Sequence, residues 1–124
     1  MDEQALQRQA DLFRALMHPA RLAILATLRG GEECVCHLEA RLGYRQAYIS
    51  QQLAVLREAG LVRDRRDGWN VYYWVAQPAV FALLDTAGAV VGGLDAPGES
   101  AGRLADCPCP KCAAALETAP GAGG

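Results

Sequence analysis

Five cysteines carry the most distinctive chemistry of this 124-residue chain, and they fall into two groups. Cys34 and Cys36 form a C-x-C pair, whereas Cys107, Cys109 and Cys112 lie near the end of the chain, interleaved with two prolines. Thiolates select soft ions, and such spacings let neighbouring sulfurs converge on one ion. The pattern predicts a site for As(III), Cd(II), Pb(II) or Zn(II), built either from both groups or from the second group alone.

Thiol oxidation is the alternative chemistry for the same residues. A disulfide or polysulfide bridge between the two groups would make the chain a redox or reactive-sulfur sensor. The acidic start of the chain and the lack of a long apolar run predict a cytoplasmic protein without a membrane partner, in which thiols stay reduced. An enzyme with a small-molecule substrate is not expected, because no oxyanion loop or base-orienting motif accompanies the cysteines.

The elements that must position these thiols follow from apolar spacing and from glycine and proline. Helical spacing predicts helices over 4–16, 19–28, 35–42, 45–59 and 78–91. Runs 61–66 and 70–75 read as strands joined at Asp67-Gly68. This order predicts a mostly α, α+β winged helix-turn-helix domain over 1–92, with a two-stranded hairpin as its wing and a flexible tail over 93–124. The last helix is apolar nearly all round, which predicts a homodimer interface shared with the first helix.

The charge pattern points to nucleic acid. The net charge of the chain is only −2, yet six arginines and two acids lie between Arg41 and Arg66, a local balance of +4. A helix-turn-helix presents the start and outward side of its second helix to bases, and basic residues of a wing bind phosphate. The predicted contacts to double-stranded DNA are Arg45, Gln46, Tyr48, Ser50, Gln51, Gln52, Arg63, Arg65 and Arg66.

Two segments resemble the ArsR/SmtB family of metal-sensing repressors. The run Glu33-Cys34-Val35-Cys36-His37-Leu38 is similar to that family's cysteine motif, and residues 47–62, AYISQQLAVLREAGLV, are similar to its recognition helix and following strand. In the family a histidine is frequent where this chain has Gln52. The resemblance spans about residues 5–90. It implies a dimer that binds an operator and loses affinity for DNA when a ligand binds.

The resemblance also suggests how ion binding at the cysteines would act on DNA binding, and it bears on the roles of the two histidines. Cys34 and Cys36 begin the predicted helix that supports the recognition helix, so an ion that joins them to the tail would shift that support. His18 precedes a proline and is predicted to be a structural cap, whereas His37 is weighed as an auxiliary ligand. The family's other metal position, on the last helix, is predicted to be absent because Asp85 is the only candidate ligand there.

Overall fold

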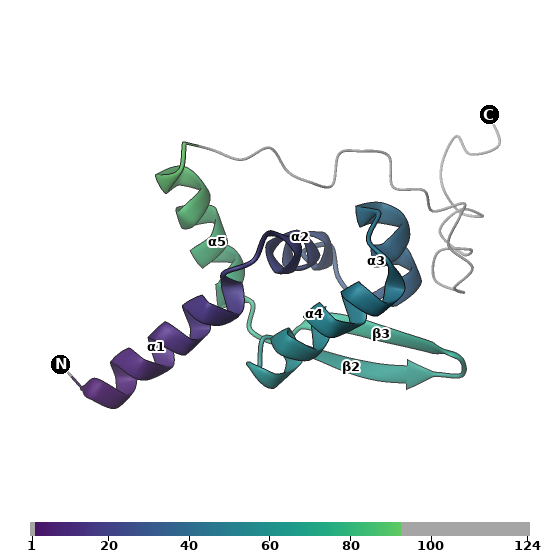
Figure 1. Ribbon diagram of the computed structural model, residues 1–124, viewed down its shortest axis with the longest axis horizontal. Helices are drawn as coiled ribbons and strands as arrows, with labels where there is room; N and C mark the ends of the chain where they lie inside the picture. The colour runs from purple at the N-terminus through teal and green to yellow at the C-terminus, as the bar shows by residue number, and fades with distance from the viewer. Residues whose placement is uncertain (1, 93–124) are drawn as a thin grey trace.

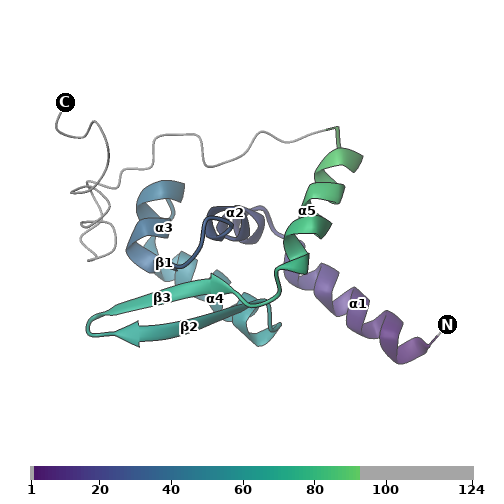
Figure 2. The same ribbon diagram turned by 180° about the vertical axis from the view of Figure 1, so that it is seen from behind.

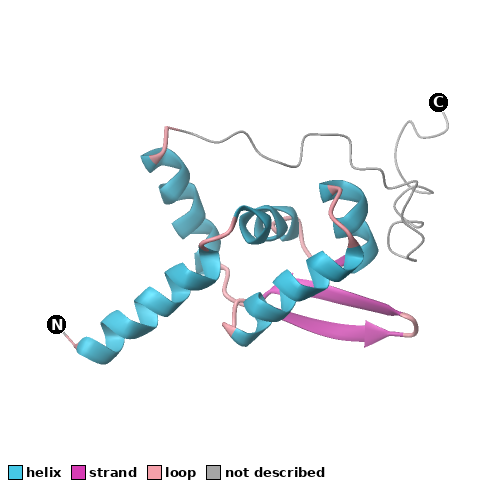
Figure 3. Cartoon of the chain, in the orientation of Figure 1, coloured by secondary structure: helices cyan, strands magenta, loops and turns pink. Residues whose placement is uncertain are grey.

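A computed structural model describes residues 2–92, so the predicted tail and its three cysteines lie outside the described residues. The elements follow in the order α1 (Glu3–Leu16), α2 (Pro19–Leu28), β1 (Glu33–Cys34), α3 (Val35–Leu42), α4 (Gln46–Glu58), β2 (Val62–Asp67), β3 (Asn70–Val75) and α5 (Ala79–Val90) (Figure 1). Each predicted helix and both predicted strands are confirmed. Helices and hairpin together form the predicted winged helix-turn-helix (Figure 3).

Local side-chain chemistry sets where the helices begin and end. Asp2 caps α1 by accepting the amide of Gln4 at 3.1 Å. His18 caps α2 directly before Pro19, with Nδ1 accepting the Ala20 amide at 3.2 Å, which confirms its predicted structural role. Helix α3 ends at Gly43, whose φ of 76° is the left-handed conformation that a helix end requires.

The hairpin belongs to a three-stranded antiparallel sheet of order β1-β3-β2. The sequence predicted only β2 and β3, and the structure adds β1, in which Cys34 is paired with Tyr72. The turn is also one residue later than predicted. Asp67 pairs with Asn70, so the loop is Gly68 and Trp69, with Gly68 at a φ of 63°. A positive φ at the first loop position is what a type II′ hairpin turn requires.

Helices α2, α3 and α4 pack around one core, which the sheet covers on one side (Figure 2). The side chains at its centre are fully buried, and they are Ile24, Leu25, Leu38, Ile49, Leu53 and Leu56. Because each of these helices buries one apolar stripe, the burial of this core fixes how α3 and α4 cross.

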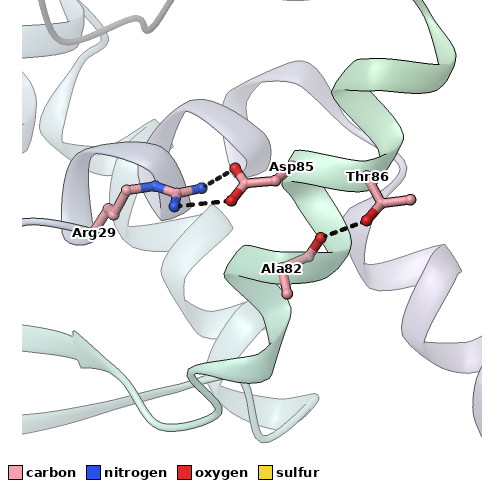
Figure 4. Close-up of polar contacts among 4 residues, drawn as sticks. All are labelled: Arg29, Ala82, Asp85 and Thr86. Atoms are coloured by element: carbon pink, nitrogen blue, oxygen red, sulfur yellow. Dashed lines mark hydrogen bonds and ion pairs between the residues drawn. The ribbon is translucent and has the colours of Figure 1, made fainter.

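Helices α1 and α5 lie at the end of the molecule opposite the hairpin tip (Figures 1 and 2). Asp85 on α5 accepts two hydrogen bonds from Arg29 at the end of α2, at 2.7 and 3.3 Å (Figure 4). The guanidinium of Arg29 also lies 4.8 Å above the ring of Phe81, a cation–π contact. These contacts orient α5, although Val80 is its only buried residue. Within residues 2–92, no helix has the length and apolar character needed to span a membrane.

Candidate nucleic-acid interface and thiol site

The exposed face of α4 carries the predicted base-reading residues. Gln46, Ser50 and Gln51 are exposed, and Arg45 is exposed directly before the helix. Gln46 and Ser50 are four residues apart, so they lie on one side of the helix. Both lie at the edge of the buried stripe that includes Ile49, whereas Gln51 lies on the opposite side of the helix, and the exposed amide and hydroxyl groups of these three residues can reach base edges.

Gln52 does not belong to that face. It is only 8% exposed, and its Oε1 accepts a hydrogen bond from Nε of Arg21 at 2.8 Å. Nη1 of Arg21 donates to the carbonyls of Arg14 and Ala15, at 3.3 and 3.2 Å, at the end of α1. The prediction that Gln52 faces outward is therefore wrong. It lies three residues after Ile49 and four before Leu56, so helical spacing places it on the buried side, where its bond to Arg21 of α2 links α4 to the end of α1.

Tyr48 anchors the start of α4 and is half-buried. Its hydroxyl lies 3.3 Å from Nε2 of His18, and its ring is 5.2 Å from that of Tyr44. Because Nδ1 of His18 accepts the Ala20 amide, the neutral ring carries its hydrogen on Nε2 and donates it to the Tyr48 oxygen. The hydrogen of the Tyr48 hydroxyl is then available to a further acceptor.

The three predicted wing arginines differ in their surroundings. Arg65 donates to both carboxylate oxygens of Glu32, at 2.7 and 2.8 Å, and its guanidinium lies 4.7 Å above the ring of Tyr72. The hydrogen bond to Glu32 raises the pKa of Arg65. Arg63 and Arg66 are exposed and form no salt bridge within residues 2–92. The wing thus presents two arginines outward and one that is held against the protein.

The described half of the thiol site lies where β1 passes into α3. Cys34 is 1% exposed, and its Sγ accepts the backbone amide of His37 at 3.2 Å, whereas Cys36 is half-buried in the first turn of α3. An amide donor at a helix N-terminus stabilises a thiolate. Nε2 of His37 lies 3.5 Å from Oε2 of Glu33, and both side chains are buried.

The two described cysteines do not complete a metal site by themselves. Among residues 2–92, no group of three or more His, Cys, Asp and Glu side chains is placed to hold a metal ion. Cys34 and Cys36 lie two residues apart at the start of α3, and the other predicted ligands, Cys107, Cys109 and Cys112, lie outside the described residues.

The position of Cys34 connects it to both elements that are predicted to face DNA. It caps α3, which packs on α4, and it pairs with Tyr72 of the wing strand β3. Two residues earlier, Glu32 holds Arg65 of the wing. The sequence indicated the connection from Cys34 through α3 to α4. The connection from Cys34 through β1 to the wing was not predicted, because no local pattern in two residues predicts a strand.

Comparisons with known proteins agree with this geometry. A family model described as bacterial regulatory protein, arsR family, matches residues 18–64. The chain is 44% identical over 81 residues to a biofilm growth-associated repressor of Agrobacterium fabrum, covering 65% of this chain and 69% of that protein. It is 42% identical over 77 residues to a transcriptional repressor SmtB homolog of Synechocystis, covering 62% of this chain and 58% of that protein.

A solved structure shows the same fold. It is the homodimeric winged helix-turn-helix DNA-binding domain of a possible ArsR-family regulator from Mycobacterium bovis, with a TM-score of 0.64 and 32% identity. The match covers 73% of this chain and 86% of that one.

Proposed function

Because this chain belongs to the ArsR family of bacterial regulatory proteins, whose members bind DNA and are not enzymes, we propose that it is an operator-binding repressor released by ions at its cysteines. The observation that carries the proposal is the position of Cys34. One residue caps the helix behind the recognition helix and pairs with the wing strand, so a ligand on its sulfur acts on both DNA-facing elements.

The proposed repressor acts as a homodimer. Large apolar side chains of α1 and of the end of α5 are exposed, namely Leu6, Phe13, Met17, Val90 and Val91. A second copy that covers them would bury apolar surface at one end of the molecule, as the homodimeric relative suggests. The two copies of α4 would then reach successive major grooves of an operator with matching two-fold symmetry.

In this proposal the DNA contacts divide by chemistry. Gln46, Ser50 and Gln51 read base edges, because amide groups pair with adenine in the major groove. The phosphates are bound by Arg45, Arg63 and Arg66, with Arg65 joining them when it leaves Glu32. Tyr48 and Gln52 hold α4 in place and do not read bases.

The proposed inducer is a thiophilic ion, with As(III), Cd(II), Pb(II) and Zn(II) as candidates. Cys34 and Cys36 would supply two thiolates, and Cys107, Cys109 or Cys112 the rest. Ligation would draw the Cys34 sulfur from the His37 amide and displace β1 and the start of α3. A ligand shifts such an equilibrium only by its differential affinity, and couplings are typically about 5- to 150-fold.

Thiol oxidation is the second candidate function, favoured by one specific observation. The amide that Cys34 accepts and its place at a helix N-terminus both stabilise the thiolate, which is the form that oxidants and persulfides attack. Cys36 is the more exposed of the pair and would react first.

One titration tests both functions. Reduced protein on a labelled operator is titrated with Cd(II) or As(III), and separately with peroxide or persulfide in the presence of a chelator. The main proposal expects ions alone to release DNA, and expects the double variant Cys34→Ser, Cys36→Ser to bind DNA without responding. Release by the oxidants alone would favour the second function, and ion-induced release from the double variant would refute the proposed site.

A further inference from the structure

Trp69 is the most exposed large hydrophobic side chain of the described structure, at 99%. It occupies the second position of the two-residue turn at the hairpin tip, between Gly68 and Asn70. Within residues 2–92 it takes no part in the core or in an aromatic pair. Nothing in the turn needs an indole ring, since Gly68 supplies the positive φ and the register is set by the pairing of Asp67 with Asn70.

The surroundings of Trp69 indicate what it contacts. The exposed arginines Arg63 and Arg66 lie on the strand that leads to it. In both ribbon views the hairpin tip and the corner between α3 and α4 lie at the same end of the molecule, opposite α1 and α5 (Figures 1 and 2). A partner that meets this end meets positive charge on the wing and the start of α4 together, which fits a nucleic-acid duplex.

We propose that Trp69 is a minor-groove anchor, with its indole packed against the sugars and base edges where the wing meets DNA. The inference rests on the proposed operator binding and names a residue that adds to it. The ring supplies apolar contact in a narrow groove, and its N–H can donate to the acceptors that A·T pairs present there. A preference for A·T pairs beneath the wing follows, outside the bases read by α4.

The first test compares operator affinity across salt concentrations. We expect Trp69→Ala to weaken binding by about 5- to 50-fold, as for other aromatic contacts to nucleotides. The slope of log affinity against log salt should stay unchanged, because indole neutralises no phosphate. The matched control, Arg66→Ala on the same wing, should lower that slope by about one for each protomer. Both positions are exposed, so thermal melts of the two variants should match the parent.

The second test observes the ring itself. The chain has two tryptophans, so a Trp74→Phe variant leaves Trp69 as the only indole emitter. On operator binding its emission should shift to the blue, and iodide quenching should fall. Unchanged quenching, or Trp69→Ala binding within twofold of the parent, would overturn the inference while operator binding stands. Full affinity in vitro with lost repression in cells would place Trp69 against a protein instead. A parent that binds no DNA would refute the proposed function itself.

Discussion

The hydrogen bonds of Arg21 make the recognition helix depend on the first helix. One guanidinium donates to Gln52 on α4 and to the carbonyls of Arg14 and Ala15 at the end of α1. A cation is favoured at a helix C-terminus, so both the charge and the hydrogen bonds of Arg21 stabilise the end of α1. Its removal should loosen α4 without touching any residue that reads DNA.

The size of the effect follows from the number and burial of these bonds. A hydrogen bond to a charged group contributes about 1.5–3 kcal/mol, and less where solvent competes. Arg21 is half-buried and makes three such bonds, of which the one to Gln52 is the shortest, so Arg21→Ala should lose about 2–3 kcal/mol. In a domain of this size that corresponds to a fall in Tm of about 10–20 °C. Gln52→Leu removes one acceptor and should cost about 1–2 kcal/mol.

Urea unfolding of the two single variants and the double variant measures the coupling, at one protomer concentration because the stability of the proposed dimer would depend on it. We expect a coupling of about 1–2 kcal/mol between Arg21 and Gln52. Additive losses, with a coupling below about 0.3 kcal/mol, would show that Arg21 and Gln52 do not stabilise the fold through each other.

A matched pair of charge variants separates positioning from base reading. Gln52→Glu places its carboxylate against Arg21, so operator affinity should stay within about threefold of the parent. Gln51 is exposed on the proposed DNA-binding face, so Gln51→Glu should lose far more affinity, because its carboxylate would approach phosphates. Equal losses for the two variants would contradict the inward placement of Gln52.

Three further expectations follow from single contacts. Glu32→Gln should tighten operator binding a few-fold by releasing Arg65, measured by anisotropy at low salt. Burial raises the pKa of Tyr73, so the neutral phenol stabilises the fold below about pH 10 and this contribution is lost as pH rises through the native pKa. Urea midpoints of Tyr73→Phe should therefore fall less steeply above pH 10 than those of the parent. Gly68→Ala, at a φ of 63°, should cost about 1 kcal/mol of stability, whereas Gly30→Ala, which has open space and no positive φ, should be neutral in the same thermal melts.

Much of this fold could be predicted from local patterns in the sequence. Apolar spacing located the five helices, and glycines and prolines marked their ends, because these signals act within a few residues. The hairpin was visible for the same reason. Strand β1 was not visible, since Glu33 and Cys34 become a strand only by pairing with β3, about forty residues later in the chain.

In the candidate site, too, local features could be predicted from the sequence, whereas contacts between distant residues could not. The polar face of α4 was predicted from the residue types, but Gln52 was assigned by its polarity, although its helical spacing from both Ile49 and Leu56 places it inward. The ion pair of Arg65 with Glu32 joins residues 33 positions apart, so no sequence pattern could indicate that this arginine is held. The thiol site is predicted from composition and resemblance, and three of its five cysteines lie outside the described residues.

In the proposed function, ion ligation and operator binding oppose each other, and binding free energies that oppose each other do so reciprocally. Cd(II) is titrated into reduced protein, free and on saturating operator, by following the sulfur-to-metal absorption with a competing chelator. We expect operator to weaken Cd(II) binding by the same factor by which Cd(II) weakens operator binding, about 5- to 150-fold. Superimposed Cd(II) titrations with and without operator would contradict it.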